Sequence, residues 1–298
     1  MRRLALCLLA SSALSVGFAP LASAADGAVP PTYKAPPAVV AVPYSWTGVY
    51  VGAHLGVGWT RKHWGSPGPD CIGGLGSIGC LSDLGSHGAS GFLGGGQTGF
   101  NWQTERLVFG IEGQFSFASL NADHVRSNPF TFANADGFVT FTGTERFSSS
   151  VKDIGTIAAR IGVALGPTGG TLLYVKGGAA FGHDSFTLNS TDIVSCTRGA
   201  CRTFPSGTSV GVFDGSQTRW GWMAGPGIEY ALSDHWSAKV EYNYLDLGTK
   251  NITLPGSICT PTCRPASRTV AIDQTIQLIK AGINYRFWWG KAPVVAKY

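Results

Sequence analysis

The sequence predicts an all-β protein: an antiparallel, up-and-down transmembrane β-barrel of about eight strands, with long extracellular loops and short periplasmic turns. Three observations lead to this fold class. Apolar residues alternate with small or polar residues from residue 46 almost to the end of the chain, which is the side-chain period of a strand. The polar face repeatedly carries charge. The connections between the alternating segments are short and long in turn, an asymmetry expected of an outer-membrane barrel.

The composition supports a membrane protein without helices. Of 298 residues, 44% are hydrophobic and only 13% are charged, against roughly 25% charged in soluble domains. The 42 glycines disfavour helices, because Gly weakens a helix interior by about 1 kcal/mol relative to Ala. The net charge of +5 falls to +3 without Arg2 and Arg3, which is too mild to indicate nucleic-acid binding.

The N-terminus predicts export. Residues 1–24 are expected to be a signal peptide, with Arg2 and Arg3 before an apolar stretch and Ala-Ser-Ala at the cleavage site. Residues 25–45 are rich in proline and predict an extended periplasmic linker, for which contact with the cell wall is a further expectation. Residues 46–287 would form the barrel and residues 288–298 a short C-terminal extension. No run of 18 apolar residues follows the leader, which leaves a closed barrel as the way to cross a bilayer.

The first segment, residues 46–59, sets the pattern. Its odd-numbered positions are mostly apolar and its even-numbered positions are small or polar. In a barrel that spans a membrane, the apolar face contacts lipid and the polar face lines the lumen. We therefore expect lipid at Val49, Val51, Leu55 and Val57, and the lumen at Tyr50 and His54.

Seven further segments repeat the alternation, each long enough for the roughly 9–11 residues that cross a bilayer at a tilt. In chain order they are residues 89–102, 106–117, 153–165, 171–183, 218–231, 236–247 and 273–287. Their lipid-facing residues are, in the same order, Phe92 and Phe100; Phe109 and Ile111; Ile157 and Ile161; Leu173 and Val175; Trp220 and Ile228; Trp236 and Val240; Ile279 and Ile283. Pro226 lies in the sixth of the eight segments between two glycines, where it predicts a bulge or kink rather than a strand end.

The connections alternate in length. Short turns are predicted at residues 103–105, 166–170 and 232–235. Long polar loops are predicted at residues 60–88, 119–152, 184–217 and 248–272. The short turns and both chain ends then lie on the periplasmic side.

The lumen is predicted to carry charges of both signs. These are Glu112, Arg160, Lys176, Glu229, Lys239, Glu241 and Lys280. About eight strands enclose a space that side chains just fill, so these charges are expected to pair across the lumen and plug it. The alternative is a narrow pore for small solutes, in which lumen glycines such as Gly52, Gly56 and Gly162 leave space.

Six cysteines follow the leader and form three near-neighbour couples, each inside a different predicted loop. The couples are Cys71 and Cys80, Cys196 and Cys201, and Cys259 and Cys263. Export favours disulfides. Six cysteines allow 15 connectivities, and neighbour pairing follows if each loop stays on its own side of the barrel mouth. Such small closed loops would add about 2–3 kcal/mol at most, so they would stiffen loop tips. The spacings lack the C-x2-C of a zinc knuckle and the C-x-x-C of a redox site.

Enzymatic chemistry is not expected. The six histidines are scattered, with His54 in the lumen, His63, His87 and His124 in loops, and His183 and His235 at strand ends. No G-x-S-x-G sequence occurs, and nothing in the sequence groups a nucleophile with a base. We expect no catalytic residue, cofactor or metal site.

Several motifs carry a family resemblance. Residues 44–52 read Tyr-Ser-Trp-Thr-Gly-Val-Tyr-Val-Gly, and residues 282–287 read Gly-Ile-Asn-Tyr-Arg-Phe. Residues 220–222, 227–230 and 240–244 add Trp-Gly-Trp, Gly-Ile-Glu-Tyr and Val-Glu-Tyr-Asn-Tyr. Together they resemble the alphaproteobacterial outer-membrane immunogenic proteins, within the wider OmpA-like, porin-family barrels. The resemblance covers about the whole mature chain.

The resemblance implies a location in the cell outer membrane and a structural and surface-antigen role in the cell envelope. It implies outer-membrane lipid and the barrel-assembly machinery as partners. That machinery reads a terminal aromatic residue, and the chain offers Phe287 and Tyr298. It also leaves open a second alternative, the binding of haemin or a host molecule through the long loops, for which His63, His87 and His124 would be the candidates.

Overall fold

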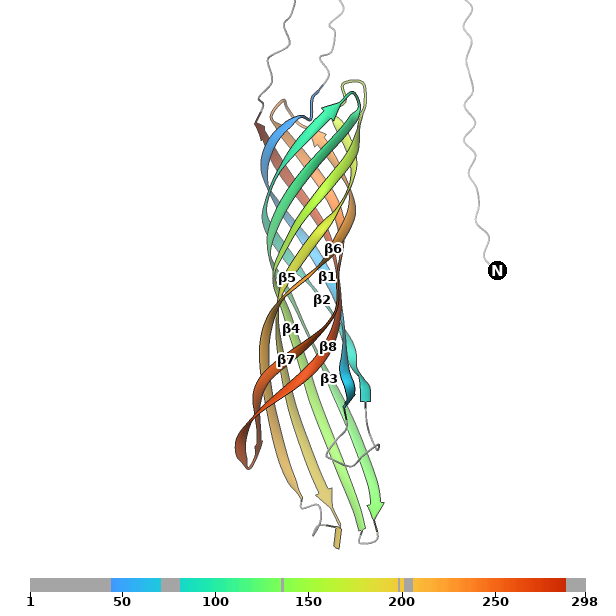
Figure 1. Cartoon of the computed structure of the whole chain (residues 1–298), viewed down its shortest axis with the longest axis vertical. Coiled ribbons are helices and arrows are strands. Elements are labelled where there is room, and N and C mark those ends of the chain that lie inside the picture. Colours follow the sequence, from blue (N-terminus) through green and yellow to red (C-terminus); the bar gives the residue numbers. More distant parts are fainter. Residues whose placement is uncertain (1–43, 71–80, 135–136, 198, 201–205, 288–298) are drawn as a thin grey trace, which may run out of the picture. The chain divides into compact units, whose positions relative to one another are not determined.

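In the computed structural model, eight strands form a closed antiparallel barrel in the order β1-β2-β3-β4-β5-β6-β7-β8 (Figure 1). The structure describes residues 44–70, 81–134, 137–197, 199–200 and 206–287. The predicted signal peptide, all but the last two residues of the predicted linker, and the C-terminal extension lie outside the described residues.

Each strand pairs with its neighbour in the sequence, and β8 pairs with β1 to close the ring. The strands are β1 (Gly48–Asp70), β2 (Leu81–Thr104), β3 (Leu107–Asn134), β4 (Gly137–Leu165), β5 (Thr171–Cys196), β6 (Gly207–Ala231), β7 (Trp236–Thr260) and β8 (Thr262–Phe287). The up-and-down barrel of eight strands is therefore confirmed. Among the described residues, no helix is long and apolar enough to span a membrane.

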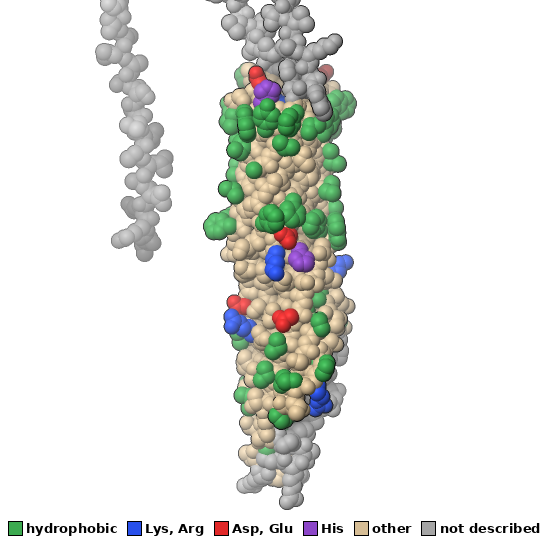
Figure 2. All heavy atoms as spheres, turned by 90° about the vertical axis from the view of Figure 1, so that its left-hand side faces the viewer, with side chains coloured by type: hydrophobic (Ala, Val, Ile, Leu, Met, Phe, Trp, Pro, Cys, Tyr) green, Lys and Arg blue, Asp and Glu red, His purple; other side chains and the backbone are tan. Residues whose placement is uncertain are grey.

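A band of exposed apolar side chains surrounds the half of the barrel nearest the short turns. Exposed aromatic residues mark both edges of this membrane band. They are Trp102, Tyr230, Trp236 and Phe287 at the short-turn end, and Trp59, Phe92, Phe117 and Trp220 at the other. On the face shown in Figure 2, hydrophobic side chains gather in two belts, and charged side chains lie directly beyond the second. Two aromatic girdles around an apolar wall are the features by which a barrel fits a bilayer.

The strands continue well beyond the second girdle. They are 23 to 29 residues long, about twice what a bilayer requires. The prediction of long loops at residues 60–88, 119–152, 184–217 and 248–272 was therefore wrong for most of their length. The β3–β4 hairpin, for example, remains paired from Leu107 opposite Val163 to Asn134 opposite Gly137. We call the part beyond the second girdle the extension.

The polarity of the wall inverts in the extension. In β8, the apolar residues Ile279 and Ile283 point outward into the membrane band, whereas Ile272 and Ile276 point inward and are fully buried. The outside of the extension faces water, so its apolar side chains gather inside, as in a soluble sheet. Its core consists of Trp64, Leu84, Phe147, Phe186, Leu188, Phe213, Ile252, Leu254, Val270 and Ile272.

Two breaks in the backbone ladder divide the wall of the extension. Pairing between β2 and β3 stops beyond Ser90 opposite Asn121. Between β6 and β7, pairing is interrupted from Phe213 to Trp222. Over the interrupted stretch, the strands of the extension form two groups, β7-β8-β1-β2 and β3-β4-β5-β6, that share the core described above. Nearer the hairpin tips, β6 and β7 pair again, from Phe213 opposite Gly256 to Val210 opposite Cys259.

Pro226 interrupts the ladder without ending its strand. It lies in β6 opposite Val175, and the β6–β7 pairing passes from Ala224 to Gly227 with no change of register. Strand continuity was predicted correctly, and the unchanged register excludes the bulge among the two predicted distortions: the missing proline N–H removes a ladder bond locally. The first short turn also lies later than predicted, at Glu105 and Arg106, where Glu105 has a φ of 54°.

Candidate functional site

The structure places all seven predicted lumen charges inside the membrane band of the barrel, each at most 4% exposed. They come from six consecutive strands, β3 to β8. Neighbouring strands stand side by side around the ring, so residues far apart in the sequence converge on one layer. We refer to this layer, made of Glu112, Arg160, Lys176, Glu229, Lys239, Glu241 and Lys280, as the charge layer.

Two carboxylates form the centre of the charge layer. Glu112 lies 2.7 Å from Lys239 Nζ and 3.0 Å from Lys176 Nζ. Glu241 lies 2.9 Å from Lys176 Nζ and 3.3 Å from Lys239 Nζ, and its other oxygen is 3.0 Å from Lys280 Nζ. Lys176 and Lys239 therefore each bridge both carboxylates.

The remaining cation is held by aromatic rings as well as by a carboxylate. Arg160 Nη1 lies 3.2 Å from Glu229, and its Nε donates to Asn101 Oδ1 at 2.8 Å. The guanidinium lies over the rings of Tyr50 and Tyr174, 4.9 Å from each centroid. Such cation–π contacts gain strength when water is excluded. The arrangement fixes Arg160 across the lumen.

The charge layer satisfies the physical condition for burying ions. A buried charge is tolerated only when it is paired and hydrogen-bonded. Each of the four cations has a carboxylate within 3.2 Å. The phenol groups of Tyr50 and Tyr174 donate to Glu112 and Glu241 at 2.9 and 3.1 Å. The layer thus forms one connected network across the lumen.

A segment ahead of β1 covers the short-turn mouth of the barrel. Trp46, 1% exposed, packs with Val108 and Leu172. Its backbone N–H donates to Gln103 Oε1 at 2.6 Å, and its indole N–H donates to the carbonyl of Gly169 at 2.9 Å. Trp46 was predicted to begin the first strand; instead it precedes β1, and its side chain covers the mouth and connects two of the short turns.

An apolar layer, which was not predicted from the sequence, lies between the charge layer and the extension. Its members are Ala89, Leu93, Leu120, Val151, Ile154, Ala158, Ala180, Met223, Leu245, Leu247, Ile276 and Leu278. They come from seven strands, β2 to β8. The sequence of β8 contains a signal for this layer. Its apolar residues occupy odd-numbered positions from Ile279 onward, but even-numbered positions up to Leu278. Such a change of phase indicates that the apolar face has moved from lipid to the interior.

The space beside the lumen glycine Gly52 is filled. A Cβ atom at Gly52 would stand 2.3 Å from Asn284 Oδ1 and 2.6 Å from Gln97 Nε2. Distances below 3 Å mean that neighbouring side chains already occupy the space. The expectation that these glycines open the lumen is therefore wrong at this position.

The histidines lie mainly in strands. His54 faces the lumen as predicted, with Nδ1 2.6 Å from Gln97 Oε1 and Nε2 2.7 Å from Ser116 Oγ. The predicted loop residues His63, His87 and His124 are instead in β1, β2 and β3. His183 lies within β5 and His235 in the turn after β6. In the described part of the chain, His, Cys, Asp and Glu form no group of three that could hold a metal ion.

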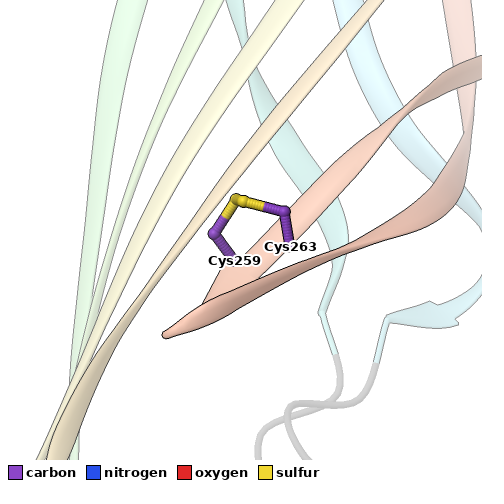
Figure 3. Close-up of a disulfide and its surroundings, with 2 residues drawn as sticks. All are labelled: Cys259 and Cys263. Carbon is purple, nitrogen blue, oxygen red and sulfur yellow. A yellow bond between two sulfur atoms is a disulfide. The ribbon is translucent and has the colours of Figure 1, made fainter.

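Among the described residues, one predicted disulfide has both of its cysteines in view. Cys259 and Cys263 are joined at the tip of the β7–β8 hairpin (Figure 3). Cys196, the last residue of β5, is also disulfide-bonded. Its predicted partner Cys201, together with Cys71 and Cys80, lies outside the described residues. The described cysteines occupy strand ends rather than loops, because the hairpins extend almost to their tips.

We expect the Cys259–Cys263 disulfide to act locally. In the double variant Cys259→Ser with Cys263→Ser, the free energy of unfolding should change by about 2 kcal/mol or less, because the closed loop is short. Proteolysis should become faster at the hairpin tip only. Urea unfolding in detergent and mapping of the cleavage sites would measure both. Reducing the wild-type protein should reproduce the faster cleavage at this tip and also open the second disulfide, that of Cys196; collapse of the whole barrel in the double variant would contradict the prediction.

A comparison with known families identifies this fold. Residues 11–287 match the family described as the outer membrane protein beta-barrel domain. The chain belongs to this outer-membrane β-barrel family. The outer-membrane barrel is 31% identical to the 31 kDa outer-membrane immunogenic protein of Brucella melitensis biotype 1, over 93% of this chain and 98% of the relative. It is 28% identical to the 25 kDa outer-membrane immunogenic protein of Brucella abortus biovar 1, over 96% and 100%.

The outer-membrane barrel is therefore homologous to the Brucella immunogenic proteins, and it is located in the cell outer membrane. Among solved structures, it is similar to OprG from Pseudomonas aeruginosa, at 12% identity and a TM-score of 0.37, over 83% of this chain and 99% of that one. The Ail protein of Yersinia pestis gives 12% identity and a TM-score of 0.32, over 81% and 99%.

Proposed function

We propose that this outer-membrane barrel is a closed, non-enzymatic protein with a structural and surface-antigen role in the cell envelope. The observation that carries the proposal is the series of barriers along the barrel axis. Trp46 covers the short-turn mouth, the charge layer crosses the lumen, and the apolar layer follows it. Ions crossing the apolar layer would lose their hydration without gaining a partner.

The extension supports the surface-antigen role. Its hairpins carry the wall beyond the membrane band, with a polar outer face and an apolar core. A rigid, projecting structure of this kind presents backbone and side chains at a distance from the lipid surface. The Brucella relatives are named as immunogenic proteins, in agreement with such exposure.

We further propose that the barrel-assembly machinery inserts the chain by reading a terminal aromatic residue. Phe287, the last residue of β8, is one candidate and faces outward; Tyr298 is the other. Outer-membrane lipid would surround the membrane band, and the proline-rich linker would reach toward the cell wall.

Planar-bilayer recording tests the closed lumen. We expect refolded wild-type protein to show no steady conductance, because the charge layer and the apolar layer both block the axis. A shift in gel migration on boiling would verify that the same preparation is folded. Conductance steps that disappear in Arg160→Gln or Lys176→Gln would instead support the narrow pore and overturn the proposal.

Haemin titration tests the absence of a loop-borne ligand. We expect no spectral shift that depends on His63, His87 or His124, because His87 and His124 are engaged with each other (Nδ1 to Nδ1, 2.7 Å). A haemin spectrum lost on substituting these residues would favour ligand binding over a purely structural role.

A further inference from the structure

The break between β2 and β3 is bridged by side chains. Beyond Ser90 opposite Asn121, no backbone pairs join these two strands among the described residues. His87 of β2 and His124 of β3 meet across the break, with their Nδ1 atoms 2.7 Å apart. This contact links β2 and β3 where their backbone ladder is broken.

The hydrogen bonds determine where the protons lie. His124 Nε2 is 3.1 Å from the carbonyl oxygen of Leu84. A carbonyl can only accept, so His124 Nε2 donates, and in the neutral ring His124 Nδ1 must accept. His87 Nδ1 then donates to it, and His87 Nε2 accepts from the Ser149 hydroxyl at 2.7 Å. The proton order is fixed along the whole chain of bonds.

The local backbone is shaped to make this contact. The register between β1 and β2 shifts at Leu84. Trp64 pairs with Gly85, whereas the next residue of β1, Gly65, pairs with Asp83. Leu84 is therefore an extra residue that forms a bulge in β2. A bulge re-aims the groups beside it. Gly85 has a φ of +99°, and a Cβ there would stand 3.0 Å from His124 Nε2. The glycine thus provides both the backbone conformation and the space that His124 requires.

We propose that His87 and His124 form a proton-sensitive latch that holds β2 against β3 and releases when both rings are protonated. One added proton is tolerated, because the Ser149 hydroxyl can turn to accept from His87 Nε2 while His87 Nδ1 still donates. A second proton would place N–H groups on both Nδ1 atoms. Two opposed donors and two positive charges cannot remain 2.7 Å apart.

The surrounding charges set the pH at which the latch weakens. Lys62 of β1, itself 2.8 Å from Asp184 of β5, opposes protonation of His87. Asp123 of β3, which also pairs with Arg146 of β4, favours it. Asp83, at the bulge, receives the Gly85 N–H at 2.7 Å. From β4, the latch meets only the neutral groups Ser149 and Phe147.

Burial first, and then His124 and Lys62, lower the pKa of His87 from 6.5 to about 4. The sign follows from linkage. In the released state the ring regains a pKa near 6.5, so the released state takes up protons first. The ratio of closed to released molecules is therefore highest above pH 6.5. It falls by about a hundredfold as the pH decreases toward 4.

Spin labels across the break would test the latch in the refolded full-length protein. The labels are placed on unnatural amino acids at Ser86 and Val125, two exposed positions on β2 and β3, so that the native cysteines stay intact. We expect dipolar broadening at pH 7 and its loss by pH 3.5. A control pair at His63 and Ser86, which are direct partners on β1 and β2, should broaden equally at both values.

Two further measurements separate the latch from general acid unfolding. In His124→Gln, the pH dependence across the break should disappear, whereas the exposed-residue control His63→Gln should keep it. Ring-nitrogen NMR of the wild-type protein at pH 7 should show His87 protonated at Nδ1 and His124 at Nε2. Unchanged broadening at pH 3.5, full pH dependence in His124→Gln, or the opposite tautomers would each overturn the proposal.

Discussion

Replacement of Glu241 by Gln should destabilise the barrel by about 3–5 kcal/mol. Glu241 contacts Lys176, Lys239 and Lys280 at 2.9 to 3.3 Å. The amide keeps the shape but removes the charge, and Lys280 then has no carboxylate within 4 Å among the described residues. A buried cation without a counter-ion is far costlier than the lost attraction alone. Urea unfolding of the refolded protein in detergent micelles, followed by heat-modifiable migration on gels, would measure the loss.

The matched control is Glu105→Gln. Glu105 is exposed in the β2–β3 turn, where the same chemical change should alter the free energy of unfolding by less than about 0.5 kcal/mol. Equal changes in the free energy of unfolding for the two variants would mean that water hydrates the charge layer and screens its ion pairs, contrary to its burial in the structure.

The second large effect is expected from Ile111→Arg, which should cost about 2–4 kcal/mol in a lipid bilayer. Ile111 is 56% exposed on the outside of β3, near the middle of the membrane band. Val125, on the outside of the same strand, is 60% exposed but lies in the extension. Val125→Arg should therefore be nearly neutral, because its side chain is already in water. Unfolding in lipid vesicles would measure both variants.

The comparison of Ile111→Arg with Val125→Arg also locates the edge of the membrane. A large cost at both positions would place Val125 in lipid and shift the second girdle outward. A small cost at both would remove the argument that the apolar band contacts lipid at all.

Alternation was sufficient to predict the barrel and the inward direction of its charges. Each strand has a period of 2, so Glu112 had to face away from Ile111 whatever the rest of the chain did. The strands also had to be neighbours in chain order, because the short turns leave no room for a crossover. The seven lumen charges were found in this way, but their partners were not: that Lys176 meets both Glu112 and Glu241 depends on the register of five strands.

The extension was mistaken for loops because its composition is polar overall. Its apolar residues, such as Trp64 and Phe147, alternate in the opposite phase to those of the membrane band. A search for outward apolar residues passes over them. The bulge at Leu84 and the meeting of His87 with His124 had no sequence signal, since those histidines are 37 residues apart and their approach follows from the curvature of two strands.

The sequence by itself therefore determined the exported, lipid-facing, eight-stranded barrel with a charged inner face, because side-chain alternation and connection length are local properties of the chain. Only the tertiary structure decided which side chains follow one another along the barrel axis, namely Trp46, the charge layer and the apolar layer. It also decided that the wall continues beyond the membrane around a core of its own, with breaks in the ladder between β2 and β3 and between β6 and β7. The physical reason is that filling a lumen depends on which side chains from different strands share one level. That level is set by the register around the ring, which only closure of β8 on β1 fixes.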